Sequence, residues 1–160
     1  MLIEPYLMTR LLVQSCSKTK NTVREAEPAL DVYDGYFFKI INKAIDDKDF
    51  RPDIELRILS AKHGIIHPDD QITDYNRRMT GDRATAIREA VTNDITESVD
   101  DSNAEGVVLN VGEDYLPAVK GLDKKLDIPV ARITGSGIGE KGHTLRKFIR
   151  GQVDPSGVVE

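Results

Sequence analysis

Apolar residues occur along the chain in short blocks, and four of these blocks predict buried strands. Each block is a run of aliphatic and β-branched residues, which is typical of a strand buried on both faces of a sheet. The predicted strands cover residues 9–15, 54–61, 106–111 and 128–133. Strands that alternate with helical patterns indicate a parallel sheet with right-handed crossovers. We therefore predict a three-layer, Rossmann-like α/β domain with a mainly parallel sheet of about four strands.

Between the predicted strands, apolar residues recur at helical spacing and indicate four helices. The first is expected to begin near Pro28, a residue suited to the first turn of a helix, and to end at the acidic turn 46–49. The second is expected from Asp82, and the others follow Gly112 and the glycine-rich turn 135–139. The apolar stripe of the first helix is Leu30, Tyr33, Phe37, Ile40, Ile41 and Ala44, and that of the second is Ala84, Ile87, Val91, Ile95 and Val99. The stripe of the third helix is Tyr115, Leu116, Val119 and Leu122, and that of the fourth is Leu145, Phe148 and Ile149.

Three stretches lie outside these elements. Residues 65–80 show no sustained period and contain Pro68, so a long functional loop is predicted there. Residues 1–8 are expected to form a loosely held arm, and residues 151–160 a tail. The 160 residues fit a single domain, with a core over about residues 9–150, and contain no repeat or linker that would divide it.

The amino-acid composition does not alter the predicted fold. Hydrophobic residues make up 39% of the chain and charged residues 31%, as in ordinary soluble proteins. The single cysteine excludes an intramolecular disulfide, and no apolar run approaches membrane-spanning length, so a cytoplasmic protein is expected. The net charge of −5 argues against non-specific coating of duplex DNA. A local basic face remains compatible with a nucleotide or the end of a nucleic acid.

Polar and glycine residues follow all four predicted strands. The carboxyl ends of parallel strands meet at one edge of a sheet, where α/β proteins place their ligands. We therefore predict an anion-binding pocket at this edge. Its predicted phosphate- or nucleotide-binding residues are Ser15, Ser17, Lys18, Lys20, Ser60, Lys62, Gly64, Tyr75, Gly112, Ser136 and Gly137.

The stretch after the first strand is the centre of this prediction. Its hydroxyl and backbone N–H groups can surround an anion while Lys18 or Lys20 supplies positive charge. A simple turn with solvated lysines is the alternative. Cys16 is a candidate nucleophile, activated by Lys18 or His63, although a buried small residue at a strand end is the other interpretation.

Two further segments offer acid–base chemistry. His63 follows the second strand and could transfer a proton or hydrogen-bond to a base edge. In the long loop, Asp74 could act as a general base while Tyr75 stacks on a base. Alternatively, Tyr75 packs the loop onto the core and Asp74 caps a turn. His63 and His67 are four residues apart, but the neighbouring glycine and proline disfavour a helix, so no metal site is predicted.

The glycine-rich turn 135–139 resembles a phosphate-cradling turn at a helix N-terminus. It lacks the Gly-Lys-Ser/Thr ending of a P-loop and follows the last strand instead of the first. A tight connection between strand and helix explains it nearly as well, and no cofactor is predicted from it.

Several segments resemble, in order, the motifs of a family of small proteins of unknown function. The family motifs read cSKxK at a strand end, PAxxLY, LSAKyGLlxP and PYd, and the second-strand block is the most specific. The chain departs from them at Thr73, where a proline is usual, and at Asn110, where a small residue is common. The matching segments are residues 15–20, 28–33, 58–68, 74–75, 108–115 and 137–139.

The family looks distantly similar to the peroxide-stress protein group and to the central domain of archaeosine synthase, both linked to nucleic acids or modified bases. This resemblance implies a fold and a site location more than an activity. Our first hypothesis is an enzyme that acts on a nucleotide or on a base in nucleic acid. The alternatives are a non-catalytic module for a nucleic-acid end or modified nucleoside, and a protein-interaction domain that uses the acidic helix 82–101.

Overall fold

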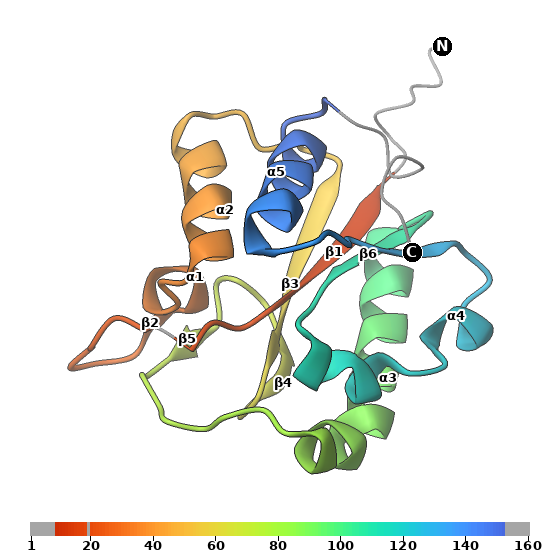
Figure 1. The fold of residues 1–160 in the computed structure, drawn as a ribbon, viewed down its shortest axis with the longest axis horizontal. Coiled ribbons are helices and arrows are strands. Elements are labelled where there is room, and N and C mark those ends of the chain that lie inside the picture. The colour runs from red at the N-terminus through yellow and green to blue at the C-terminus, as the bar shows by residue number, and fades with distance from the viewer. Residues whose placement is uncertain (1–8, 19, 153–160) are drawn as a thin grey trace.

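The computed structural model describes residues 9–18 and 20–152, which form a sheet between two layers of helices (Figure 1). The sheet has five strands in the order β4-β3-β1-β6-β7. The predicted three-layer, Rossmann-like architecture is therefore confirmed, with one strand more than expected. The predicted arm and most of the predicted tail lie outside the described residues.

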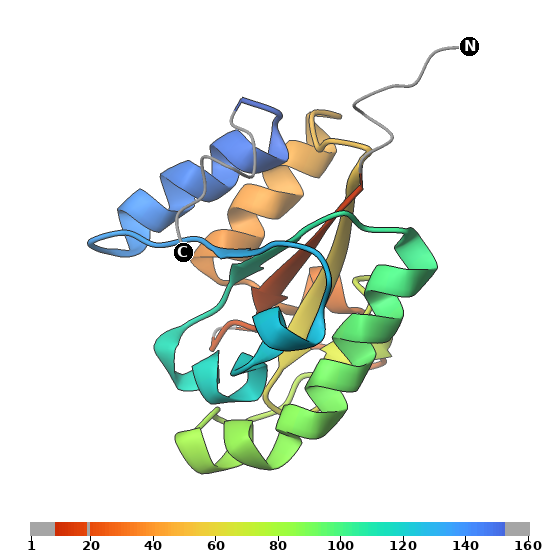
Figure 2. The same cartoon turned by 90° about the vertical axis from the view of Figure 1, so that its right-hand side faces the viewer.

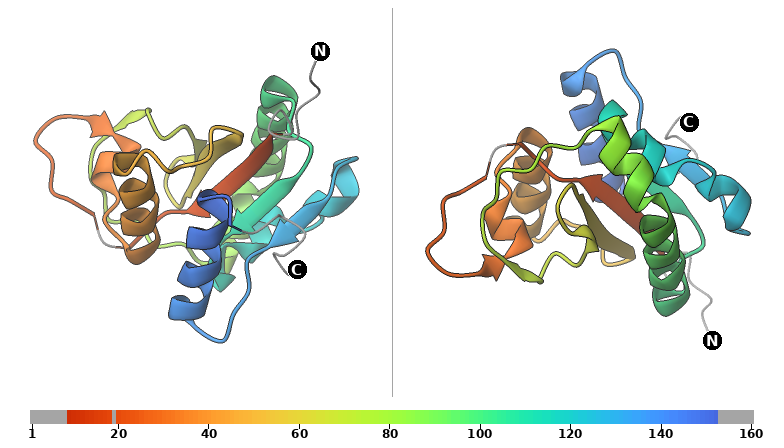
Figure 3. Two further views of the ribbon diagram at one scale, coloured as in Figure 1. Left: turned by 90° about the horizontal axis from the view of Figure 1, so that it is seen from above. Right: turned by 90° about the horizontal axis from the view of Figure 1, so that it is seen from below.

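β1 (Arg10–Ser15) occupies the middle of the sheet, between β3 and β6 (Figure 3). Its register places Leu12 opposite Leu56 on one side and Val108 on the other. The aliphatic run forms a strand because both faces are covered, and Leu11, Leu12 and Val13 are fully buried. The other parallel strands are β3 (Ile54–Ser60), β6 (Val107–Asn110) and β7 (Val130–Arg132). The edge strand β4 (Gly64–Ile66) is antiparallel to β3.

Alternate residues of β1 point into two separate cores. Leu11 and Val13 pack beneath α3 (Gly81–Ser102) and the 3-10 helix η2 (Glu113–Val119). Leu12 packs on the opposite face, beneath α2 (Tyr36–Asp46) and α5 (Ile138–Ile149). Figure 2 shows α2 and α5 side by side on one face of the sheet and α3 on the other. A short α4 (Leu122–Lys125) precedes β7.

The single helix predicted from Pro28 is wrong, because the chain forms α1 (Ala29–Val32) and α2 with a break between them. Tyr33 has an extended backbone, and its ring packs inward on Phe38 with centroids 5.2 Å apart. Pro28 belongs to the short strand β2 (Glu27–Pro28). The extended backbone at Tyr33, which forms an isolated bridge with Lys20, therefore ends α1 at a position that the helical stripe concealed.

Two other sequence-based assignments need correction. The stretch 65–80 is not wholly a loop, because it contributes β4 and also β5 (Gln71–Ile72), which pairs antiparallel with β2. The regular helix expected after Gly112 is a 3-10 helix with Pro117 inside it, followed by α4. Proline lacks the N–H that a continuous α-helix would need at this position.

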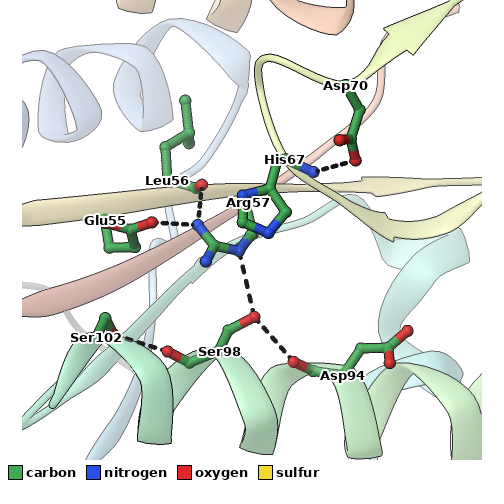
Figure 4. A network of polar contacts seen from close by, with 8 residues as sticks. All are labelled: Glu55, Leu56, Arg57, His67, Asp70, Asp94, Ser98 and Ser102. Carbon is green, nitrogen blue, oxygen red and sulfur yellow. Dashed lines mark hydrogen bonds and ion pairs between the residues drawn. The ribbon is translucent and has the colours of Figure 1, made fainter.

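A buried arginine ties β3 to α3 (Figure 4). Arg57 is 4% exposed, and its Nε donates to Ser98 Oγ at 3.2 Å. Its Nη1 donates to the Leu56 carbonyl oxygen at 2.9 Å and pairs with the Glu55 carboxylate. Buried charge is tolerated when its donors are paired, so this network fixes the register of the long helix against the sheet.

Within the described residues, no helix combines the length and apolarity needed to cross a membrane.

Candidate functional site

A cavity of about 480 Å³ opens at the carboxyl ends of β1 and β6. Its floor includes Ser15 and Cys16, which follow β1, and Gly112, which follows β6. The chain leaves β1 toward β3 and leaves β6 toward β7, so the two neighbouring connections diverge. Open α/β sheets bind ligands where adjacent connections diverge in this way.

Buried amides hold the two strand ends together beneath the cavity. Asn110 Nδ2 donates to Gln14 Oε1 at 2.7 Å, and Gln14 Nε2 donates to the Ser15 carbonyl oxygen at 3.1 Å. The Gly112 N–H donates to Ser15 Oγ at 3.3 Å. The floor is therefore rigid, because each of these polar groups has a partner in the protein.

Cys16 lies where β1, β3 and η2 meet. Its Sγ is 3.0 Å from Tyr115 Oη and accepts the Ala61 N–H at 3.4 Å. Burial, and then the neighbouring Cys16, raise the pKa of Tyr115 well above its usual value. The Tyr115 phenol is thus neutral and can donate a hydrogen bond toward sulfur. Cys16 also lines the cavity, so a role as nucleophile stays a prediction.

Four positively charged residues are among those that line the cavity. Lys18 and Lys20 come from the stretch after β1, and Arg77 and Arg78 come from the loop before α3. Asp114 is the one carboxylate among the lining residues, so four cations and one anion leave a formal charge of +3. The cavity is therefore basic although the chain as a whole is acidic.

The N-terminus of α2 forms another wall. Gly35 is its N-cap, no side chain caps it, and its first turn contains no acidic residue. Residues 35–38 line the cavity. The first N–H groups of a helix have no intrahelical acceptor, so this end favours an anion. A Cβ on Gly35 would lie 2.4 Å from Ser17 Cβ, so glycine permits the close approach of α2 to the stretch after β1.

A hydroxyl chain lies beside the cavity at the end of β3. Ser60 Oγ accepts the N–H groups of Lys62 at 3.2 Å and His63 at 3.0 Å. Both lone pairs are then used, so the Ser60 hydroxyl donates to Tyr75 Oη at 2.8 Å. Tyr75 Oη in turn lies 2.7 Å from Tyr33 Oη. Burial raises the pKa of Tyr33 to about 12 and raises that of Tyr75 further.

The predicted lysines of two strand ends gather around Tyr75. Lys20 Nζ lies 4.4 Å and Lys62 Nζ 5.6 Å from the centroid of its ring. The stretches after β1 and β3 therefore meet, with an aromatic ring between their ammonium groups. Neither Tyr75 nor Lys62 lines the cavity, and the hydroxyl of Tyr75 is already bonded. This geometry favours the interpretation in which Tyr75 packs the loop onto the core.

The other predicted residues lie around the cavity without lining it. The His63 ring meets Tyr75 edge to face, with centroids 5.5 Å apart. Asp74 Oδ1 accepts the Val23 N–H at 3.4 Å and so joins two loops. Gly64 has a φ of 73°, which suits glycine at the turn into β4.

The glycine-rich turn contributes only one residue to the cavity wall. Ser136 donates from its N–H and its hydroxyl to the Glu140 carboxylate, at 3.2 and 3.3 Å. Ile138 lines the cavity, whereas Ser136 and Gly137 do not. In the part of the chain described, no group of three His, Cys, Asp or Glu residues is placed to hold a metal ion.

His63 makes the stability of this region depend on pH. Partial burial, and then the charge of Lys62, lower the pKa of His63 below 6.5, against a weaker opposite effect of Asp70. Folding then favours neutral His63, so its contribution to stability is present above pH 6.5 and is lost as the pH falls. We expect the urea midpoint of the wild type to fall more than that of His63→Gln between about pH 7 and about pH 5. His67→Gln is the matched control, since it removes another exposed imidazole nearby and should retain the wild-type decrease if His63 alone is responsible.

Sequence reasoning missed several lining residues, among them Tyr36, Arg77, Arg78 and Asp114. The adjacent arginines could have been found, since they directly follow Tyr75 in a loop already predicted to be functional. Tyr36 was concealed because it was placed inside a continuous helix, whereas it begins α2.

The fold and the cavity define a Rossmann-like α/β protein with a basic cavity where the connections after β1 and β6 diverge. The chain belongs to the family of unknown function DUF6884, whose family model matches residues 11–147. No curated protein matches the sequence.

The fold is also similar to the crystal structure of AF0587, a protein of unknown function, with a TM-score of 0.51 and 12% sequence identity. The similarity covers 91% of this chain but 47% of AF0587, so the chain spans about half the length of that protein. At this identity the likeness concerns the fold alone.

Proposed function

We propose that the cavity binds a nucleotide, either free or at the end of a nucleic acid. The observation that carries this proposal is the coincidence of four cations and an uncapped helix N-terminus in one cavity, where the connections after β1 and β6 diverge. A phosphate group satisfies both features, because it accepts several N–H donors and carries negative charge. The volume of about 480 Å³ lies in the range of small-molecule sites.

The walls suggest how the two parts of a nucleotide would be held. Lys18, Arg77 and Arg78 would neutralise the phosphate next to the first turn of α2. Tyr36 and Ile138 line the same cavity and are 46% and 59% exposed, so a ligand in the cavity can contact both side chains. Such surfaces suit the face of a base, because aromatic stacking tolerates any base.

The family resemblance supports the same class of ligand. The motifs at residues 15–20 and 58–68 resemble those of a family of small proteins of unknown function, and that family looks distantly similar to the peroxide-stress protein group and the archaeosine synthase central domain, which are linked to nucleic acids or modified bases. The first of these motifs contributes Cys16, Lys18 and Lys20 to the cavity.

Whether the bound nucleotide reacts depends on the groups within reach. His63 and Asp74 do not line the cavity, which favours a non-catalytic binding module. Cys16 does line it, with the Tyr115 hydroxyl 3.0 Å from its sulfur, and this observation favours the enzyme. A turnover assay on a panel of nucleotides and modified nucleosides separates the two. Product that disappears with Cys16→Ser supports the enzyme, and binding that survives His63→Ala and Asp74→Ala without product supports the module.

Calorimetric titration with nucleoside phosphates and 5′-phosphorylated oligonucleotides tests the binding itself. We expect Lys18→Gln and Arg78→Gln each to raise Kd by about tenfold at low salt, and binding of the wild type to weaken as salt rises. Lys39→Gln is the matched control, because Lys39 is exposed on α2 outside the cavity. Equal affinities in all four proteins, with the fold intact, would exclude this cavity as the phosphate site.

A further inference from the structure

A second and larger cavity, of about 810 Å³, lies on the opposite side of η2. Tyr115 of η2 lines the first cavity, whereas Leu116 and Pro117 line the second. The floor of the second cavity is formed by Leu109 of β6 and Val130 of the edge strand β7. The two cavities share no lining residue, so the second is a separate feature of the molecule.

Arg132 in this cavity has an unusual environment. Its Nε is buried, and it is one of two buried side-chain nitrogens without a hydrogen bond among the described residues. The other is Arg150 Nε, but the terminal nitrogens of Arg150 pair with Asp47 and Asp49. The Arg132 guanidinium has no hydrogen bond or ion pair with any residue in the described ranges. An unpaired buried donor costs free energy, and an anionic ligand in this cavity would satisfy it.

The chemistry of the lining identifies that partner. A guanidinium is always charged and presents a planar set of donors that fits a carboxylate, sulfonate or phosphate. Arg88, also in the wall, is held by its Nε, which donates to the Pro117 carbonyl oxygen at 2.6 Å. Three cations and two carboxylates line the cavity, so it keeps a formal charge of +1. The aliphatic floor and wall would cover an apolar body attached to the anionic group.

We propose that this cavity is a second ligand site, which takes a small organic anion with an apolar body. Arg132 holds the anionic group, and Leu116 and Val130 contact the body. This inference does not depend on the proposed nucleotide site.

Anilinonaphthalene sulfonate is a suitable probe, because it joins a sulfonate to an aromatic body and fluoresces when shielded from water. We expect saturable binding to the full chain and a Kd at least about tenfold higher for Arg132→Met. Arg132→Lys keeps the charge but not the planar donors, so its Kd for the probe should lie between those of the wild type and Arg132→Met. Arg24→Met is the matched control, since this exposed arginine lines neither cavity, and Lys18→Gln reports on the first cavity. Arg24→Met should bind the probe as the wild type does, and the part of the binding that Arg132→Met removes should persist in Lys18→Gln.

Thermal unfolding distinguishes a ligand-binding arginine from a structural one. Without probe, Arg132→Met should have a Tm equal to or above that of the wild type, because no partner in the described structure is lost. With saturating probe, the Tm should rise for the wild type and stay nearly constant for the variant. A large decrease in Tm without probe would instead identify Arg132 as a structural residue.

Displacement of the probe identifies the anionic group. Naphthoate and naphthyl phosphate are compared with naphthalene methanol, which has the same body without charge, and at least one anion should displace the probe at a much lower concentration. The proposal is overturned if the neutral compound competes equally well, or if Arg132→Met and Arg132→Lys bind like the wild type. Absence of probe binding up to about 1 mM would overturn it as well.

Discussion

Replacing Gly35 by alanine should weaken the proposed nucleotide binding and destabilise the protein together. The added Cβ would lie 2.4 Å from Ser17 Cβ, a separation that neither backbone can accommodate without moving. Overpacking of this kind costs about 1–3 kcal/mol of unfolding free energy. The displaced groups are the first turn of α2 and the stretch after β1, which both line the cavity. We therefore expect Kd for a nucleoside phosphate to rise by at least about tenfold, measured by calorimetry.

Two further variants separate this steric effect from a general intolerance of alanine. Gly139→Ala changes an exposed glycine of α5 with no heavy atom within 4 Å of the added Cβ, so stability should stay constant or rise slightly. In Gly35→Ala/Ser17→Gly the opposing Cβ is removed, and much of the lost stability should return. Failure of this rescue, or normal binding by Gly35→Ala, would mean that close approach at Gly35 is not what shapes the cavity.

Ser60→Ala should cause the largest loss of stability among single substitutions near the site. Ser60 is fully buried. Its hydroxyl accepts hydrogen bonds from the N–H groups of Lys62 and His63 and donates one to the hydroxyl of Tyr75. Alanine would leave three polar groups without this partner. Each unsatisfied buried group costs about 1–3 kcal/mol, and partial access of water reduces the sum, so we expect a loss of about 3 kcal/mol in urea unfolding.

The hydroxyl chain can be tested as a unit with a double-mutant cycle. Tyr75→Phe removes one hydroxyl, and combining it with Ser60→Ala should cost less than the two separate losses added together. Ser136→Ala, at an exposed serine, is the matched control and should change stability by less than about 0.5 kcal/mol. Full additivity of Ser60→Ala and Tyr75→Phe would contradict the chain of hydrogen bonds from Ser60 to Tyr75.

The two cavities are proposed to bind different ligands. The first joins the basic stretch after β1 to an uncapped helix, and the second places an unpaired arginine over an apolar floor. Because η2 separates them, variants of Lys18 and variants of Arg132 should affect different ligands. Measuring both sets of variants with both probes therefore tests each site against the other.

The local sequence pattern was sufficient for the four parallel strands and for the layers, but not for the antiparallel edge strand β4. Aliphatic runs such as Leu11–Val13 are buried wherever they lie in a parallel sheet, and long helical crossovers impose the parallel direction. The topology also predicted that a cavity would lie at the strand ends, before any side chain was placed. These features depend on residues close together in the chain, which is why hydrophobic periodicity predicts them.

The composition of the site depended on contacts between distant segments. The break before α2 lies where the Tyr33 hydroxyl meets that of Tyr75 and where Gly35 lies against Ser17. Tyr36 and Arg78 therefore line the cavity, whereas His63 and Asp74 do not. No local pattern encodes which hydroxyl, ring or glycine will face another across the fold. Such pairings are set by close packing of the assembled core, so only the tertiary structure could determine which residues line the cavity.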